Sequence, residues 1–167
     1  MKLSVIYHSV SGNTAHMANV IAEGMRAVEG VEVGVFSIDN VDMDFVRESA
    51  CVVMGCPTYA ASPSSDFYAW LGKNATKLSL CGKLGGAFAT AQYTHGGGDL
   101  AIQNIQTHML VFSMLVYSSG MFLGKPTIHN GPVAIAAAGD TEALKPFEDT
   151  FRIYGKRMAE KAVELFG

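Results

Sequence analysis

Near the amino terminus the sequence reads Val5-Ile6-Tyr7-His8-Ser9-Val10-Ser11-Gly12-Asn13-Thr14, an apolar run that passes directly into small polar residues. The segment Lys2 to Tyr7 is typical of a short β-strand, and Asn13 to Val28 has apolar residues at helical spacing. The polar residues between them therefore form a loop at a helix start. Such a position offers unpaired backbone N–H groups and the positive end of the helix dipole, which together favour an anion.

The composition of this loop, here called the phosphate loop, favours a single phosphate monoester. It carries three hydroxyls, one amide and a glycine that lets the backbone approach closely. It has no lysine, unlike a triphosphate loop, and it lacks the spaced glycines of a dinucleotide-binding loop. An ordinary strand-to-helix turn with a hydroxyl cap is the alternative. The predicted contacts are Ser9, Val10, Ser11, Gly12, Asn13 and Thr14.

Strand-like and helix-like segments alternate along the rest of the chain. The expected strands are apolar throughout, which indicates a parallel sheet covered by helices on both faces. They lie at Lys2–Tyr7, Val31–Phe36, Ala50–Gly55, Leu84–Thr90 and Leu115–Tyr117, with an extension at Pro132–Ala138. The sequence therefore predicts one α/β domain over residues 1–167, a doubly wound five-stranded parallel sheet.

The pattern Val5-Ile6-Tyr7-x-Ser9-x-x-Gly12-x-Thr14-x-x-x-Ala18-x-x-Ile21 matches every fixed position of the flavodoxin signature, and the chain resembles that family. The resemblance implies that the phosphate loop wraps the phosphate of flavin mononucleotide (FMN). It also implies the sheet order 2-1-3-4-5.

Two further segments follow strands of the expected sheet, where parallel α/β sheets bind their ligands. A flat tricyclic ring needs aromatic or apolar faces and polar groups along its edge, and two tyrosines and a run of glycines are available for this. Alternatively, the tyrosines are ordinary loop aromatics and the glycines a flexible turn. The predicted ring contacts are Pro57, Thr58, Tyr59, Ala60, Ala61 and Ser62, followed by Thr90, Ala91, Gln92, Tyr93, Thr94, His95, Gly96, Gly97 and Gly98.

Several short motifs resemble one branch of the family, the WrbA-type quinone reductases. They are Gly55-x-Pro57-Thr58, Gly82-Lys83-Leu84, Gly96-Gly97-Gly98 and Ala136-x-Ala138-Gly139-Asp140. The resemblance implies that hydride is taken from NAD(P)H and that two electrons pass to a quinone, in proteins that are usually tetramers. The chain also differs from that branch: Tyr59 stands where it commonly has arginine, and a longer insert before Gly82 is missing. The branch also has a histidine that falls near Phe112 and Ser113 here, and the loop before the glycine run is slightly longer in this chain.

We therefore expect an FMN-dependent oxidoreductase that uses NAD(P)H and passes electrons to a quinone-like acceptor. The alternative is a flavodoxin-type electron carrier that docks on redox proteins. Such carriers tend to be strongly acidic near the flavin, whereas this chain has 15 acidic and 12 basic residues and no acid in the ring segments before Asp99. A pure interaction module is a third reading, which the intact phosphate loop argues against.

Only one side chain is considered for direct assistance to the reaction. His95 is a weak catalytic candidate at the ring edge, and a solvated loop histidine is the alternative. The other four histidines show no metal-ligand spacing, so they are given no role and no metal site is predicted.

Composition limits the partners and the compartment. A net charge of −3 gives no reason to expect nucleic acid. The most apolar stretch, Met109–Leu123, is interrupted by polar residues and too short to span a bilayer. Three cysteines without paired spacing and a strand starting directly after Met1 favour buried, reduced thiols in a cytoplasmic protein.

An apolar cluster outside any amphipathic pattern suggests self-association. Met121, Phe122 and Leu123 lie among glycines, and an exposed apolar patch usually marks an interaction site. We therefore expect a homodimer or homotetramer. In the alternative reading, these residues fold back under the last strand.

Overall fold

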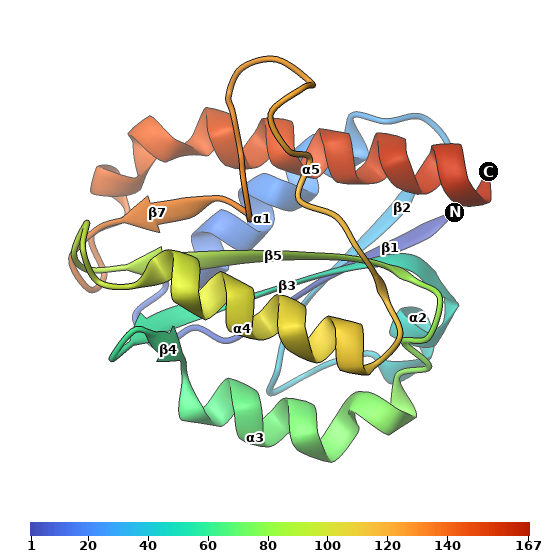
Figure 1. Cartoon of the computed structure of the whole chain (residues 1–167), viewed down its shortest axis with the longest axis horizontal. Coiled ribbons are helices and arrows are strands. Elements are labelled where there is room, and N and C mark those ends of the chain that lie inside the picture. Colours follow the sequence, from blue (N-terminus) through green and yellow to red (C-terminus); the bar gives the residue numbers. More distant parts are fainter.

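A parallel sheet forms the centre of the molecule in the computed structural model, which describes residues 1–167 (Figure 1). The strands are β1 (Lys2–Tyr7), β2 (Glu32–Ser37), β3 (Ser49–Tyr59), β4 (Ser62–Pro63), β5 (Leu84–Ala91), β6 (Leu115–Val116) and β7 (Val133–Ile135). The helices are α1 (Asn13–Arg26), α2 (Met43–Glu48), α3 (Ser65–Asn74), α4 (Gly98–Val111) and α5 (Lys145–Phe166), with short 3-10 turns at Ala75–Lys77 and Glu142–Leu144.

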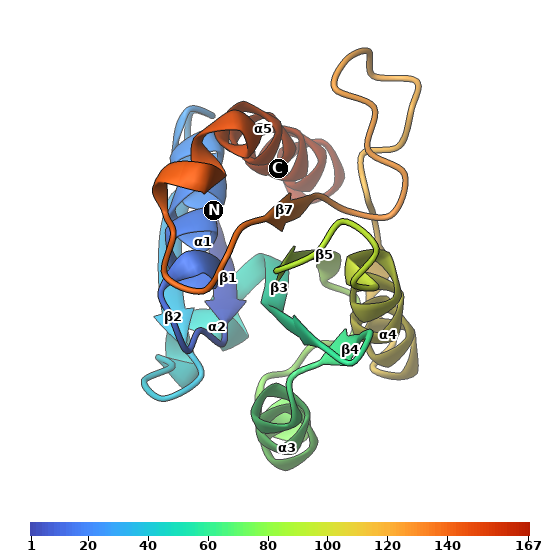
Figure 2. The same cartoon turned by 90° about the vertical axis from the view of Figure 1, so that its left-hand side faces the viewer.

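The sheet has the predicted order. Its strands run β2-β1-β3-β5, and the fifth position is shared by β6 and β7, all of them parallel. β6 pairs with the start of β5 at Leu84, whereas β7 pairs with its end from Ala89 onward. The intervening residues 117–132, here called the split-strand loop, leave the sheet and project from the molecule (Figure 2).

Helices cover both faces of the sheet and form two cores. α1 and α5 pack on one face, and α3 and α4 lie on the other (Figures 1 and 2). Alternate residues of β3 serve the two cores, since Val53 faces α1 and α5 while Val52 and Met54 face the other layer. Burial of each such side chain stabilises the fold by about 1.5–3 kcal/mol.

A short hairpin ends β3. A serine followed by proline is typical of a helix start, but Ser62 and Pro63 form β4 instead, which pairs antiparallel with Thr58 and Tyr59. The turn between them holds Ala60 and Ala61 at positive φ, 48° and 58°. Helix α3 then begins at Ser65. The resulting β3–β4 hairpin extends the sheet at the edge where the phosphate loop lies.

Two cysteines match the predicted burial and one does not. Burial raises the pKa of the Cys51 and Cys56 thiols to about 12, so they stay protonated. Cys81 is exposed instead. No helix is long and apolar enough to cross a membrane.

Candidate functional site

A cavity of about 370 Å³ opens at the carboxyl edge of the sheet. Its walls come from the segments that follow β1, β3, β5 and β7, because the ends of parallel strands meet at one edge. None of its lining residues carries a formal charge. They are Val10, Ser11, Asn13, Thr14, Pro57, Thr58, Tyr59, Ala60, Thr90, Ala91, Gln92, Tyr93, Gly96, Ala136 and Ala138.

One end of the cavity lies at the amino terminus of α1. Gly12 precedes the helix with φ of 97°, and neither a side-chain cap nor an acidic residue occupies its first turn. The first N–H groups of the helix are therefore available to an anion. The Ser9 Oγ accepts a hydrogen bond from the Gly12 N–H at 3.2 Å, which shapes the loop and leaves its own O–H free to donate.

Two side chains of the phosphate loop tie it to other walls of the cavity. The hydroxyls of Thr14 and Thr90 share a hydrogen bond of 2.8 Å. Asn13 donates from Nδ2 to the carbonyl oxygen of Ala137 at 2.8 Å. The second contact brings the segment after β7 to the cavity, which explains why Ala136 and Ala138 line it although they were absent from the predicted contacts.

Two residues that line this cavity each carry a buried polar atom without a hydrogen-bond partner. The atoms are Oδ1 of Asn13 and Oγ1 of Thr58. Unpaired buried polar atoms are uncommon in folded proteins, since each costs about 1–3 kcal/mol. Such atoms fit a ligand that supplies the missing hydrogen bonds.

The ring segments approach each other by close backbone packing. A Cβ on Gly97, which has φ of 85°, would lie only 2.4 Å from the Cβ of Ala61 on the hairpin. The Gly96 N–H donates to the Tyr93 carbonyl at 2.9 Å, so it closes a turn and is not free for a ligand. Tyr59 and Tyr93 stand at the cavity mouth with 51% and 65% of their surfaces exposed.

Most of the predicted contacts lie together around the cavity, but some do not line it. His95 and Thr94 are exposed beyond its rim, so the histidine does not face the cavity. The predicted residues that lie outside the lining are Ser9, Gly12, Ala61, Ser62, Thr94, His95, Gly97 and Gly98.

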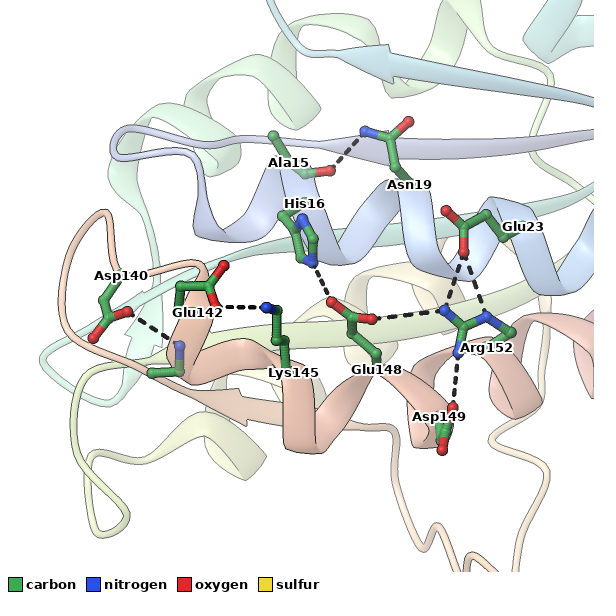
Figure 3. Close-up of polar contacts among 11 residues, drawn as sticks. Ala15, His16, Asn19, Glu23, Asp140, Glu142, Lys145, Glu148, Asp149 and Arg152 are labelled. Atoms are coloured by element: carbon green, nitrogen blue, oxygen red, sulfur yellow. Dashed lines mark hydrogen bonds and ion pairs between the residues drawn. The ribbon is translucent and has the colours of Figure 1, made fainter.

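An ion-pair network fastens α1 to α5 beside the phosphate loop (Figure 3). His16 points from the first turns of α1 toward Glu148 on α5, with Nε2 and Oε1 2.8 Å apart. Arg152 joins Glu148 to Glu23 and also pairs with Asp149. Partly exposed pairs of this kind contribute about 0–1 kcal/mol each, so the network orients the two helices more than it stabilises them.

Comparison with known proteins gives the family. A model of the flavodoxin family matches residues 5–167. The chain belongs to the flavodoxin family. A flavodoxin from Clostridium saccharobutylicum is 38% identical over 166 residues, covering 99% of this chain and all of that protein.

Quinone enzymes are also similar to this flavodoxin-family chain, at lower identity. An NAD(P)H dehydrogenase (quinone) from Chromohalobacter salexigens is 29% identical, with 99% of both chains covered. That match extends over 199 aligned positions against 167 residues here, so about 30 positions of the enzyme have no counterpart.

Solved structures agree with the fold. A flavodoxin from the domain Archaea superposes with a TM-score of 0.74 at 24% identity, covering 98% of this chain and 99% of that one. A WrbA-like flavodoxin protein from Agrobacterium tumefaciens gives 0.71 at 22% identity, covering 98% of both. At these identities the likeness supports the fold alone.

Proposed function

We propose that this chain is an FMN-dependent electron carrier of the flavodoxin type, with residues 1–167 acting as one FMN-binding domain. The observation that carries the FMN site is a cavity that runs from an uncapped helix start to two exposed tyrosines. The choice of a carrier rests on the match to a flavodoxin over the whole chain. Flavodoxin-family membership implies FMN as the cofactor. In this proposal FMN supplies the redox chemistry when bound, and the chain supplies position and electrostatics.

The phosphate end of FMN is assigned to the phosphate loop. Backbone N–H groups at the start of α1, together with the hydroxyls of Ser11 and Thr14, offer donors to a phosphate without a cation. The unpartnered Asn13 Oδ1 fits a hydroxyl donor on the chain that links phosphate and ring, because it accepts but cannot donate. The residues present therefore fit a monophosphate better than a diphosphate.

The ring end is assigned to the two tyrosine-bearing segments. Tyr59 and Tyr93 offer flat apolar surface at the mouth, and Thr58 Oγ1 offers a polar contact within. Both tyrosines are half exposed or more, so a ring held between them would lie at the surface of the molecule. A redox protein that docks on this face can then exchange electrons directly.

The carrier is favoured over the enzyme by the length and identity of the relatives. The Clostridium saccharobutylicum flavodoxin matches this chain end to end at 38% identity. The quinone dehydrogenase is less similar and has about 30 additional positions. The weak acidity of the chain and the lack of acids in the ring segments favour the enzyme, but they carry less weight than this match.

An NAD(P)H:quinone oxidoreductase is the second candidate. One observation favours it: the match to the Chromohalobacter salexigens enzyme covers 99% of both chains. This candidate includes NAD(P)H as co-substrate, a quinone-like acceptor, and assembly into a dimer or tetramer. His95 has no assigned role in either candidate.

Two measurements on the FMN-reconstituted protein test these proposals. Titration of apoprotein should show tight binding of FMN and much weaker binding of riboflavin and FAD, because only FMN ends in a monophosphate. Equal affinity for riboflavin contradicts the FMN site. Steady-state assays with NADH or NADPH and a quinone then separate the candidates: the carrier predicts no sustained turnover, and turnover in a stable oligomer favours the enzyme.

A further inference from the structure

A buried histidine joins the phosphate loop to the β3–β4 hairpin without lining the cavity. His8 directly precedes Ser9 and is 7% exposed. Its Nδ1 lies 2.7 Å from the Oγ of Ser64, which is 2% exposed and directly follows the hairpin. The His8 N–H also donates to the Gly55 carbonyl at 3.1 Å, so the residue is fixed by backbone and side chain alike.

Ser64 makes this contact in place of a helix-capping hydrogen bond. It occupies the N-cap position of α3, where serine usually accepts a hydrogen bond from the second or third helical N–H. No such side-chain bond exists here, because the hydroxyl turns to His8 instead. The bond to His8 thus replaces a helix-capping bond, which indicates that the His8–Ser64 contact has a structural role of its own.

One charged group lies close to the His8 ring. Nε2 lies 3.8 Å from an Asp66 carboxylate oxygen in the first turn of α3. Cys56 of β3 lies beside Ser64, and burial raises the pKa of its thiol to about 12, so it stays protonated. The short bond between Nδ1 and Ser64 is thus the one hydrogen bond of the His8 ring, since Asp66 lies beyond hydrogen-bond distance.

We propose that His8 is a positioning residue that couples the two halves of the cavity. Its bond to Ser64 fixes the base of the hairpin, and the hairpin carries Thr58, Tyr59 and Ala60 into the cavity wall. Occupation of the phosphate loop then orders the ring wall, and the reverse holds equally, because coupling between two sites is reciprocal. This inference rests on the proposed FMN site.

The test measures that coupling with two fragments of FMN. Riboflavin binding to apoprotein is titrated with and without saturating inorganic phosphate, and the ratio of the two dissociation constants is the coupling factor. A single hydrogen bond of ordinary strength predicts a factor of about three- to tenfold in the wild type. His8→Leu and Ser64→Ala should reduce it to about one.

A conservative variant separates coupling from general packing. Asparagine places a polar atom near the position of Nδ1, so His8→Asn should retain most of the coupling, whereas leucine cannot. His129→Leu, in the exposed part of the split-strand loop, is the matched control and should leave the factor unchanged. Ser64→Ala keeps the histidine ring in place, so the test stands even if His8→Leu fails to fold.

Each outcome has one meaning. A wild-type chain that fails to bind FMN overturns the proposed function and this inference with it. FMN binding with no coupling in the wild type, or with coupling retained in His8→Leu or Ser64→Ala, overturns the inference alone. Loss of coupling in both variants with recovery in His8→Asn supports it.

Discussion

The phosphate loop (Ser9–Thr14) and the split-strand loop (residues 117–132) are both irregular connections that begin where a strand ends, yet they are held in different ways. The phosphate loop is six residues long and is fixed largely by its own side chains, through Ser9, Asn13 and Thr14. The split-strand loop has few internal bonds, such as that from Ser118 Oγ to the His129 carbonyl at 2.6 Å.

A single distant side chain holds the split-strand loop instead. Arg157 of α5 is 7% exposed and donates to the carbonyls of Leu123, Gly124, Lys125 and Pro126 at 2.9–3.2 Å, with a longer contact to Ser119 Oγ. Its guanidinium has no carboxylate partner. In the phosphate loop, short side chains of the loop itself reach out to Thr90 and Ala137. The split-strand loop depends instead on one long side chain that reaches in from a packed helix.

Replacing Arg157 should have the largest effect on stability. Arg157→Met removes the donor from several carbonyls at once, and we expect a loss of about 3 kcal/mol in the free energy of unfolding. FMN affinity should stay within about twofold, since the arginine does not line the cavity. Urea unfolding of both apoproteins measures the difference.

Arg152→Met on the same helix is the control. Arg152 is partly exposed and forms only surface ion pairs, so its loss should cost about 1 kcal/mol or less. If Arg157→Met and Arg152→Met lower the free energy of unfolding equally, the buried contacts of Arg157 with the carbonyls stabilise the fold no more than surface ion pairs do.

Replacing Thr14 should affect binding more than stability. Thr14→Val removes a hydroxyl at the proposed phosphate site, and the lost charge-assisted bond should weaken FMN binding by about 1.5–3 kcal/mol. Riboflavin affinity should change much less. Ser9→Ala should also weaken FMN binding, through the bond from the Gly12 N–H that shapes the loop.

Fluorescence titration with FMN gives these affinities. Thr127→Val, at an exposed threonine of the split-strand loop, is the control and should bind FMN as the wild type does. If Thr14→Val and Ser9→Ala both retain wild-type affinity, the phosphate lies elsewhere.

Close packing at the cavity edge can be tested with two glycines of similar backbone. Gly97 has φ of 85° and lies against Ala61, whereas Gly124 in the split-strand loop has φ of 82° and nothing within 4 Å of a built Cβ. Alanine strains the backbone at both sites, and only at Gly97 does it also meet the hairpin. We expect Gly97→Ala to lower the free energy of unfolding by about 1–3 kcal/mol more than Gly124→Ala. If the two variants lower the midpoint temperature of unfolding equally, the hairpin moves aside without cost.

The smallest effect on stability is expected at the tip of the split-strand loop. Phe122 is 95% exposed, so Phe122→Ser should change the free energy of unfolding by less than about 0.5 kcal/mol. Met121 and Leu123 are also exposed, which rules out folding back under the last strand. If the predicted self-association uses this tip, light scattering at micromolar concentration should give a lower mass for the variant than for the wild type. An unchanged oligomer would place the interface elsewhere.

Local patterns were sufficient for the phosphate loop and the sheet. A strand, a polar loop and a helix follow one another within residues 2–26. The spacing of the apolar residues and the small polar residues between them are therefore enough to recognise all three elements. The strand order followed from the family resemblance, and both were confirmed. The ring segments were located by the same reasoning, since the residues after β3 and β5 must meet at one edge.

The sequence by itself determined the elements, their alternation and the residues that gather at the carboxyl edge, because these depend on short-range spacing. Tertiary structure alone decided that Ser62 and Pro63 pair with Thr58 and Tyr59, that Ala136 and Ala138 complete the cavity, and that Gly96 closes a turn. It also decided which donor holds residues 117–132. The contacts of Asn13 with Ala137 and of Arg157 with the split-strand loop join groups tens of residues apart, and packing chooses those partners. The hairpin and the Gly96 turn are local, but like the long-range contacts they leave no periodic signal in the chain.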